Sequence, residues 1–146
     1  AHLDHSRAKI LLPKAADCWM RFRGFWGDSP SLLQVRIPPG SKKFQAWTWP
    51  LTSPQPSAAP SSSVQIGKTA RGFPSLRVGE YSLEATDKVY RYRPTEAYGA
   101  LGRLAAPFIG DPTTTTYQAT ATGPGGANIT GILETLEVVE GGCKVQ

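Results

Sequence analysis

Three residues near the amino terminus have side chains that could act together in nucleophilic catalysis: His5, Ser6 and Asp28. The chain has only two histidines, His2 and His5, so a general base that works near neutral pH must be one of them. A serine nucleophile needs such a base to take its proton and an acid to orient the base. Asp4 is too close to His5 in the chain to orient its imidazole while Ser6 also bonds that imidazole. Asp28 is the better third member of the triad. The set would form a hydrolytic site of the esterase, lipase or protease type, although no Gly-x-Ser-x-Gly elbow is present.

Arg and Lys residues also alternate with aromatic residues, in stretches 19–23, 42–47 and 90–93. Aromatic platforms with nearby cations bind single-stranded nucleic acids and glycans. The period-2 pattern favours a simpler interpretation, in which the aromatic side chains face the core and the cations face water. Because no metal-ligand spacing is visible, we expect no metal and no cofactor, and we expect no specific nucleic-acid partner.

The element that must position Asp28 is a hairpin over residues 19–40. Met20 and Phe22 alternate with polar neighbours, which is typical of a half-buried strand, and the following Asp-Ser-Pro supplies turn chemistry. His5 and Ser6 precede this hairpin on an amino-terminal arm, residues 1–12. The triad therefore requires the arm to fold beside the hairpin loop.

Farther along the chain, hydrophobic periodicity and turn residues predict the remaining elements. They are an aromatic strand over 42–49, a mobile loop over Thr52–Ser63, a hairpin over Glu80–Tyr92, a helix over Thr95–Leu104 and a last strand within 127–140. The helix places Ala97, Tyr98, Leu101 and Leu104 on one face, and we expect this face to be part of the core.

Length and composition indicate one mainly β domain spanning residues 1–146. The 15 glycines and 13 prolines imply many turns and few long helices. We therefore predict a mainly β (α+β) fold, with a single antiparallel β-sheet, one short helix and long loops. The net charge of +5 is compatible with anionic partners, but no block of like charges exists.

The two cysteines, Cys18 and Cys143, lie near opposite ends of the chain. They could pair across the domain, but they form no Cys-x-x-Cys motif. We expect free buried thiols.

Several short motifs together resemble the projecting (P) domain at the carboxyl end of an iflavirus major capsid protein, from the picorna-like viruses of insects. These are Phe22-Arg23 with Trp26, Asp28, the strand end Ile37-Pro38-Pro39-Gly40, the Tyr81–Leu104 strand and helix, and the acidic, apolar stretch Leu136–Gly142. Gln146 at the carboxyl end also fits, since picorna-like polyproteins are commonly cut after Gln.

The resemblance implies a domain on the virion surface, synthesised in the host cytoplasm and attached to other capsid proteins. Its partner would be a host receptor, glycan or membrane. The family carries an Asp-His-Ser constellation, which maps here onto Asp28 and His5-Ser6 if a segment such as Ile10–Ala16 loops out. Two other functions remain open: a stand-alone esterase-type hydrolase and a carbohydrate-binding β module.

Overall fold

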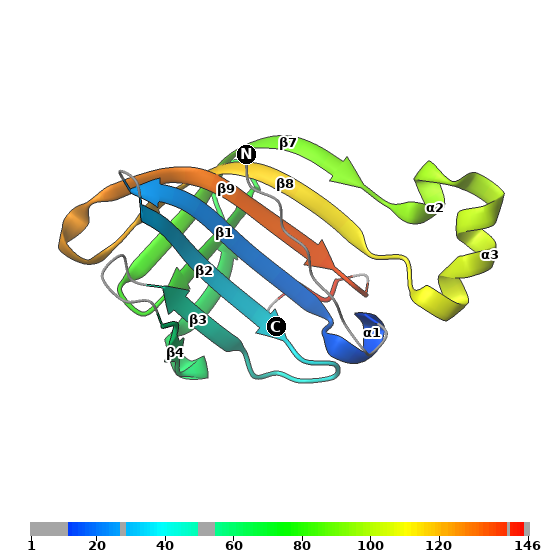
Figure 1. Ribbon diagram of the computed structural model, residues 1–146, viewed down its shortest axis with the longest axis horizontal. Coiled ribbons are helices and arrows are strands. Elements are labelled where there is room, and N and C mark those ends of the chain that lie inside the picture. Colours follow the sequence, from blue (N-terminus) through cyan, green and yellow to red (C-terminus); the bar gives the residue numbers. More distant parts are fainter. Residues whose placement is uncertain (1–11, 27–28, 50–54, 140, 145–146) are drawn as a thin grey trace.

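The computed structural model describes residues 12–26, 29–49, 55–139 and 141–144. Most of the chain forms one antiparallel sheet of nine strands in the order β4-β3-β2-β1-β9-β8-β7-β6-β5 (Figure 1). The predicted mainly β fold with a single antiparallel sheet is confirmed. The strands are β1 (Cys18–Trp26), β2 (Ser29–Ile37), β3 (Gln45–Trp49), β4 (Ser57–Ala59), β5 (Val64–Lys68), β6 (Pro74–Val78), β7 (Tyr81–Tyr92), β8 (Thr113–Thr122) and β9 (Asn128–Glu137).

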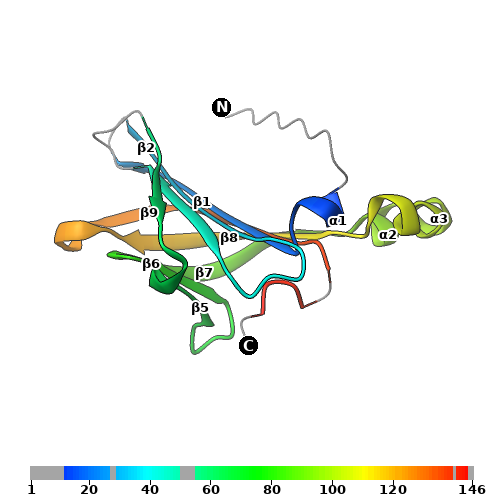
Figure 2. The same cartoon turned by 90° about the horizontal axis from the view of Figure 1, so that it is seen from below.

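The helices are short and lie outside the sheet. They are α1 (Leu12–Ala15), α2 (Pro94–Ala97), α3 (Gly99–Ile109) and two 3₁₀ turns, η1 (Ser61–Ser63) and η2 (Pro124–Gly126). Figure 2 shows α2 and α3 at the far end of the molecule, beyond the ends of β7 and β8.

The sheet curls until its two edges come close together. β4 and β5 are the edge strands, yet only Pro60 and η1 separate them in the chain. As a result, residues from both halves of the sheet enter one core on its inner face. The largest fully buried side chains are Phe22, Met20, Leu83, Leu133, Val35 and Val78. The curled sheet thus buries one face and leaves the other outside.

Two glycines allow β1 and β9 to approach closely at the centre of the sheet. Gly24 and Gly131 lie opposite each other in this antiparallel pair. A Cβ atom on Gly131 would lie 2.1 Å from the carbonyl oxygen of Arg23 and 2.7 Å from the Cα of Gly24. Any side chain at position 131 would therefore push the strands apart.

The predicted hairpin over residues 19–40 is confirmed in β1 and β2, with Met20 and Phe22 buried. The predicted hairpin over Glu80–Tyr92 is wrong, because this segment is the single strand β7. Thr86-Asp87 reads as a turn in sequence, but β8 pairs along the whole length of β7. The local irregularity is absorbed as register shifts between Ala85 and Asp87 and between Lys88 and Tyr90.

The predicted helix Thr95–Leu104 is instead divided into α2 and α3, because Gly99 adopts a positive φ of 55°. Within the predicted loop Thr52–Ser63, residues 57–59 form β4 against β3, and the Ser61 hydroxyl accepts a hydrogen bond from the Phe44 N–H at 2.8 Å. Residues 52–54 of that loop, and residues 1–11 of the predicted arm, lie outside the described part of the chain.

The expectation of free thiols is wrong: Cys18 and Cys143 form a disulfide, across 125 positions of sequence. Cys18 is buried on the inner face at the start of β1. The turn after β9 brings Cys143 back to it, and Gly142 is needed there because a Cβ atom would lie 2.3 Å from the Asp17 carbonyl oxygen. Sequence spacing could not reveal this return of the chain.

Candidate ligand-binding surface

The predicted triad falls on parts of the chain that the structure does not describe. His5 and Ser6 precede the first described residue, and Asp28 lies in the gap between β1 and β2. The Asp-His-Ser site therefore stays a prediction. The described residues contain no His and no cluster of three or more side chains suited to a metal ion.

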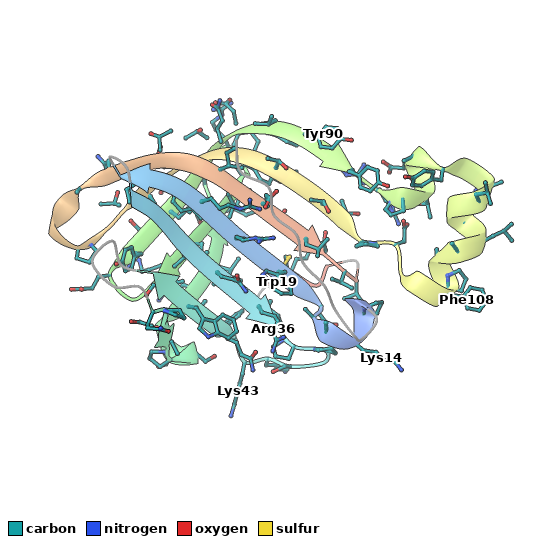
Figure 3. The ribbon with its side chains drawn as sticks, viewed as in Figure 1. Lys14, Trp19, Arg36, Lys43, Tyr90 and Phe108 are labelled. Carbon is teal, nitrogen blue, oxygen red and sulfur yellow. A yellow bond between two sulfur atoms is a disulfide. The ribbon has the colours of Figure 1, made fainter. Side chains whose placement is uncertain are left out.

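The outer face of the sheet carries aromatic, cationic and amide side chains in adjacent rows. Alternation along β1 puts Trp19, Arg21 and Arg23 on the side opposite the buried Met20 and Phe22. Strand pairing then sets Arg21 beside Gln34 of β2 and Glu134 of β9, and Gln34 beside Trp47 of β3. We call this surface the outer platform, and it comprises Trp19, Arg21, Arg23, Gln34, Arg36, Trp47 and Glu134. Figure 3 shows Trp19 and Arg36 together on this side of the sheet.

The cations of the outer platform are held by neighbouring acceptors. Glu134 accepts a hydrogen bond from the guanidinium of Arg23 at 2.5 Å, and the Nε of Arg21 lies 3.9 Å from the same carboxylate oxygen. Only 27–35% of these three side chains is exposed. Arg36 binds the side-chain oxygen of Gln45 through Nε at 3.0 Å. The platform therefore offers oriented hydrogen-bonding groups and does not form an unbroken track of positive charge.

Trp19 and Trp47 stand on strands that flank β2, displaced by two residues along the sheet. Strand spacing and rise place such positions about 12 Å apart. Both rings are half-buried, and the indole N–H of Trp19 is buried without an acceptor among the described residues. Buried unsatisfied donors are uncommon in native proteins and mark sites that deserve a functional explanation.

The expectation that the aromatic residues face the core holds for only part of the set. Phe22 is buried and Phe44 packs on the core, whereas Trp47 lies on the outer face and Tyr90 is 59% exposed. Sequence reasoning missed Trp47, Gln34 and Glu134 as members of one surface. The signal that would identify them is cross-strand register, which no single strand contains.

A second polar feature is a pocket of about 310 Å³ beside the core, where β7 and β8 run toward α2. It is lined by Lys88, Arg91, Arg93, Asp111, Thr113, Thr115, Tyr117 and Glu137. The pKa of Tyr117 is raised, mainly because the side chain is buried. A hydrogen bond with Thr115 lowers this pKa, and the charge of Glu137 raises it, but both effects are smaller than that of burial.

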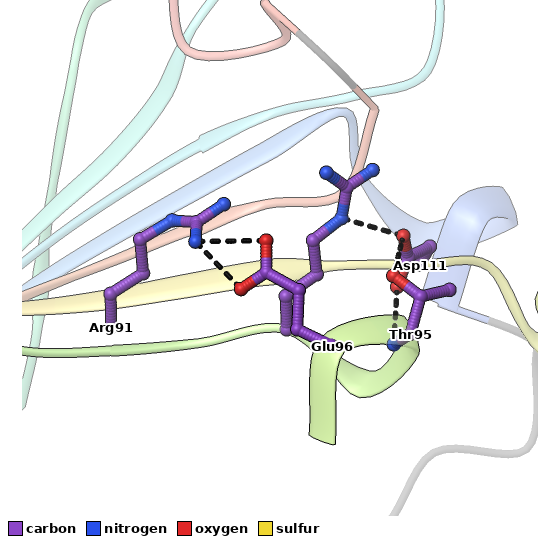
Figure 4. Close-up of polar contacts among 5 residues, drawn as sticks. Arg91, Thr95, Glu96 and Asp111 are labelled. Carbon is purple, nitrogen blue, oxygen red and sulfur yellow. Dashed lines mark hydrogen bonds and ion pairs between the residues drawn. The ribbon is translucent and has the colours of Figure 1, made fainter. Parts of the chain in front are cut away.

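Ion pairs at the end of this pocket form a clasp between β7, α2 and the start of β8 (Figure 4). Asp111 pairs with the Nε of Arg93 at 2.6 Å and accepts the hydroxyl of Thr95 at 2.7 Å and its backbone N–H at 3.1 Å. Burial alone would raise the pKa of Asp111, but these Thr95 hydrogen bonds and the Arg93 guanidinium hold it below its usual value. Arg91 binds both carboxylate oxygens of Glu96. The contacts are arranged to hold the chain in place, so we treat them as structural.

Comparison of the chain with protein-family models and with curated proteins finds no match. The functional assignment therefore depends on the chemistry of the surfaces described above.

Proposed function

We propose that this chain is an extracellular attachment domain that binds carbohydrate on the outer platform, and that it is displayed on the surface of a non-enveloped virion. The observation that carries the proposal is the juxtaposition, through strand register, of Trp19 and Trp47 with the Arg21–Glu134–Arg23 group.

The platform chemistry suits a sugar better than a nucleic acid. Sugar rings present an apolar face that stacks on indole, and hydroxyl groups that need oriented donors and acceptors. Arg21, Arg23, Gln34 and Glu134 supply both kinds of group in fixed positions. A nucleic acid would require cations free to contact phosphates, whereas Glu134 places a negative charge at the centre of the surface. The spacing of the two indoles fits an oligosaccharide rather than a single sugar.

The disulfide supports a site outside the cytosol. Disulfides persist in oxidising surroundings, including cell and virion surfaces, and are rare in cytosolic proteins. The bond between Cys18 and Cys143 is therefore consistent with an exposed surface module. The resemblance to an iflavirus projecting domain supports the more specific placement on a capsid.

A glycan array probed with the 146-residue chain tests the carbohydrate proposal. We expect binding to a defined set of oligosaccharides, and an affinity about tenfold or more lower for Trp47→Ala, because aromatic anchors carry much of the energy of a binding site. The matched control is Phe108→Ala, which removes an exposed aromatic ring at the opposite end of the molecule (Figure 3). Uniformly negative arrays, or equal losses in both variants, would contradict the assignment.

The virion placement needs a separate experiment. Antibodies raised against the folded domain should label intact, unopened particles if the domain projects from the capsid. If the antibodies label only disrupted virus particles, or label no particles, the placement on the virion surface is contradicted. The carbohydrate result would be unaffected.

A further inference from the structure

The helical tip, which we define as residues 94–109 of α2 and α3, exposes large apolar side chains. Tyr98, Leu101, Leu104 and Phe108 each have between 65% and 75% of their surface accessible. The sequence-based expectation that this helix face joins the core is wrong, because α2 and α3 lie beyond the end of the sheet (Figure 1). Soluble proteins rarely gather exposed apolar groups without a binding role.

The exposed arrangement is built into the fold. The clasp of Asp111 with Arg93 and Thr95 joins the strand that enters the tip to the segment that leaves it. α3 also packs tightly on α2, because a Cβ atom on Gly102 would lie 2.6 Å from the carbonyl oxygen of Pro94. The apolar side chains are therefore held away from the core and cannot reach it without breaking these contacts.

The composition of α3 favours lipid over a protein groove as its occupant. Its sequence, GALGRLAAPFI, contains one charged residue, Arg103. A helix that docks on another protein usually keeps a polar face toward water, whereas a helix that is apolar on most sides is suited to a buried or lipid environment. The tip is also a protrusion at one end of the long axis of the molecule, so it can meet a flat surface first (Figure 2).

The polar groups around the tip match those of a membrane interface. Tyr90, Tyr92 and Tyr98 gather where β7 meets the helices, and tyrosines favour the headgroup level of a bilayer. A hydrogen bond with Tyr98 raises the pKa of Tyr92, with smaller effects of burial and of neighbouring Tyr charges in the same direction.

The unpaired charge on the helical tip is cationic. Glu96 is paired with Arg91, and Asp111 beside the tip is paired with Arg93. Arg103 is exposed on α3 and has no ion-pair partner among the described residues. Glu137 and Lys88, which line the adjoining pocket together, lie on the sheet and not on the tip. A cation at the tip complements anionic lipid headgroups.

We infer that the helical tip inserts shallowly into the interface of an anionic lipid membrane, with Leu101, Leu104 and Phe108 entering the acyl boundary. None of the helices in the described residues is long and apolar enough to span a membrane, so the contact is interfacial. The inference goes beyond carbohydrate binding, because it uses a different surface and requires no glycan.

Flotation of the 146-residue chain with glycan-free vesicles tests the inference. Vesicles of phosphatidylcholine with phosphatidylserine should carry the protein, and vesicles of phosphatidylcholine alone should carry less. The double variant Leu101→Ser/Phe108→Ser should lower the partition coefficient by at least about tenfold, because two large apolar side chains no longer enter the acyl boundary. Added salt should weaken the remaining binding.

Two further variants keep the result interpretable. Ile132→Ser removes an apolar side chain that is 49% exposed on β9, away from the tip, and should leave vesicle binding unchanged. Phe108→Leu retains an apolar group and should bind nearly as the parent does. Absence of the parent from anionic vesicles, or equal flotation of the double variant, would overturn the inference. A concentration-dependent dimer that the double variant abolishes, without vesicle binding by the parent, would assign the tip to protein docking instead.

Discussion

Breaking the disulfide between Cys18 and Cys143 should remove a large share of the free energy of unfolding. The bond closes a loop of 125 positions. In the chain-entropy treatment, releasing such a loop raises the entropy of the unfolded chain by roughly 16 cal/mol/K, or about 5 kcal/mol near room temperature. Measured effects are usually somewhat smaller, so we expect a loss of about 3–5 kcal/mol. The total free energy of unfolding of a domain is typically about 5–15 kcal/mol.

Urea unfolding followed by circular dichroism measures this loss. Because Cys18 is buried, the protein should be unfolded in urea with a reductant and then refolded under reducing conditions. With an m-value of about 2 kcal/mol/M, the urea midpoint should fall by roughly 1.5–2.5 M. The double variant Cys18→Ala/Cys143→Ala should reproduce the shift and should not respond to reductant.

Two results would refute this reasoning. One is a thiol assay that finds two free thiols in protein purified under oxidising conditions. The other is a midpoint that reduction leaves unchanged, which would mean that the long loop is already restricted in the unfolded chain. The first result would also remove the argument from the disulfide for an extracellular location.

Two other stability predictions come from the sheet and from the clasp. Gly131→Ala should lower the free energy of unfolding in urea by about 1–3 kcal/mol or more, because its Cβ atom would meet Arg23 and Gly24 where β9 pairs with β1. The control Gly67→Ala should cost much less, because its Cβ atom would meet only the Ser75 hydroxyl, at 3.1 Å. Similar losses of unfolding free energy in the two variants would contradict the close approach of β1 and β9. Asp111→Asn should lower the thermal midpoint near neutral pH, where the carboxylate of Asp111 is charged. The difference in thermal midpoint between the variant and the parent should shrink as the pH falls through the lowered pKa of Asp111. A difference that does not change with pH would show that the charge of Asp111 does not contribute to stability.

The fold class followed from local sequence signals. Short apolar runs with period-2 alternation, interrupted by Gly and Pro, were enough to predict a mainly β fold with one antiparallel sheet. The hairpin of β1 and β2 was also predictable, because Met20 and Phe22 alternate with polar residues and Asp28-Ser29-Pro30 has the residue types of a turn. Ser29 and Pro30 themselves pair with β1 as the first residues of β2.

Other features were decided by residues distant in sequence. β7 continues through Thr86-Asp87 because β8 supplies a partner along its whole length, and this pairing outweighs the local turn preference. Leu101 and Leu104 have the helical spacing of a core face, but periodicity records only that a face is apolar. In the folded chain α3 lies beyond the end of the sheet, and Leu101 and Leu104 are exposed there.

The candidate site shows the same division. The sequence by itself determined that Trp19 and Arg21 share one face of a strand, since that depends only on the pleat. Only the tertiary structure decided which side chains stand beside them, because strand order and register bring Gln34, Trp47 and Glu134 to the same surface. The disulfide likewise required the return of the chain to the start of β1, and separation along the sequence carries no information about that distance in space.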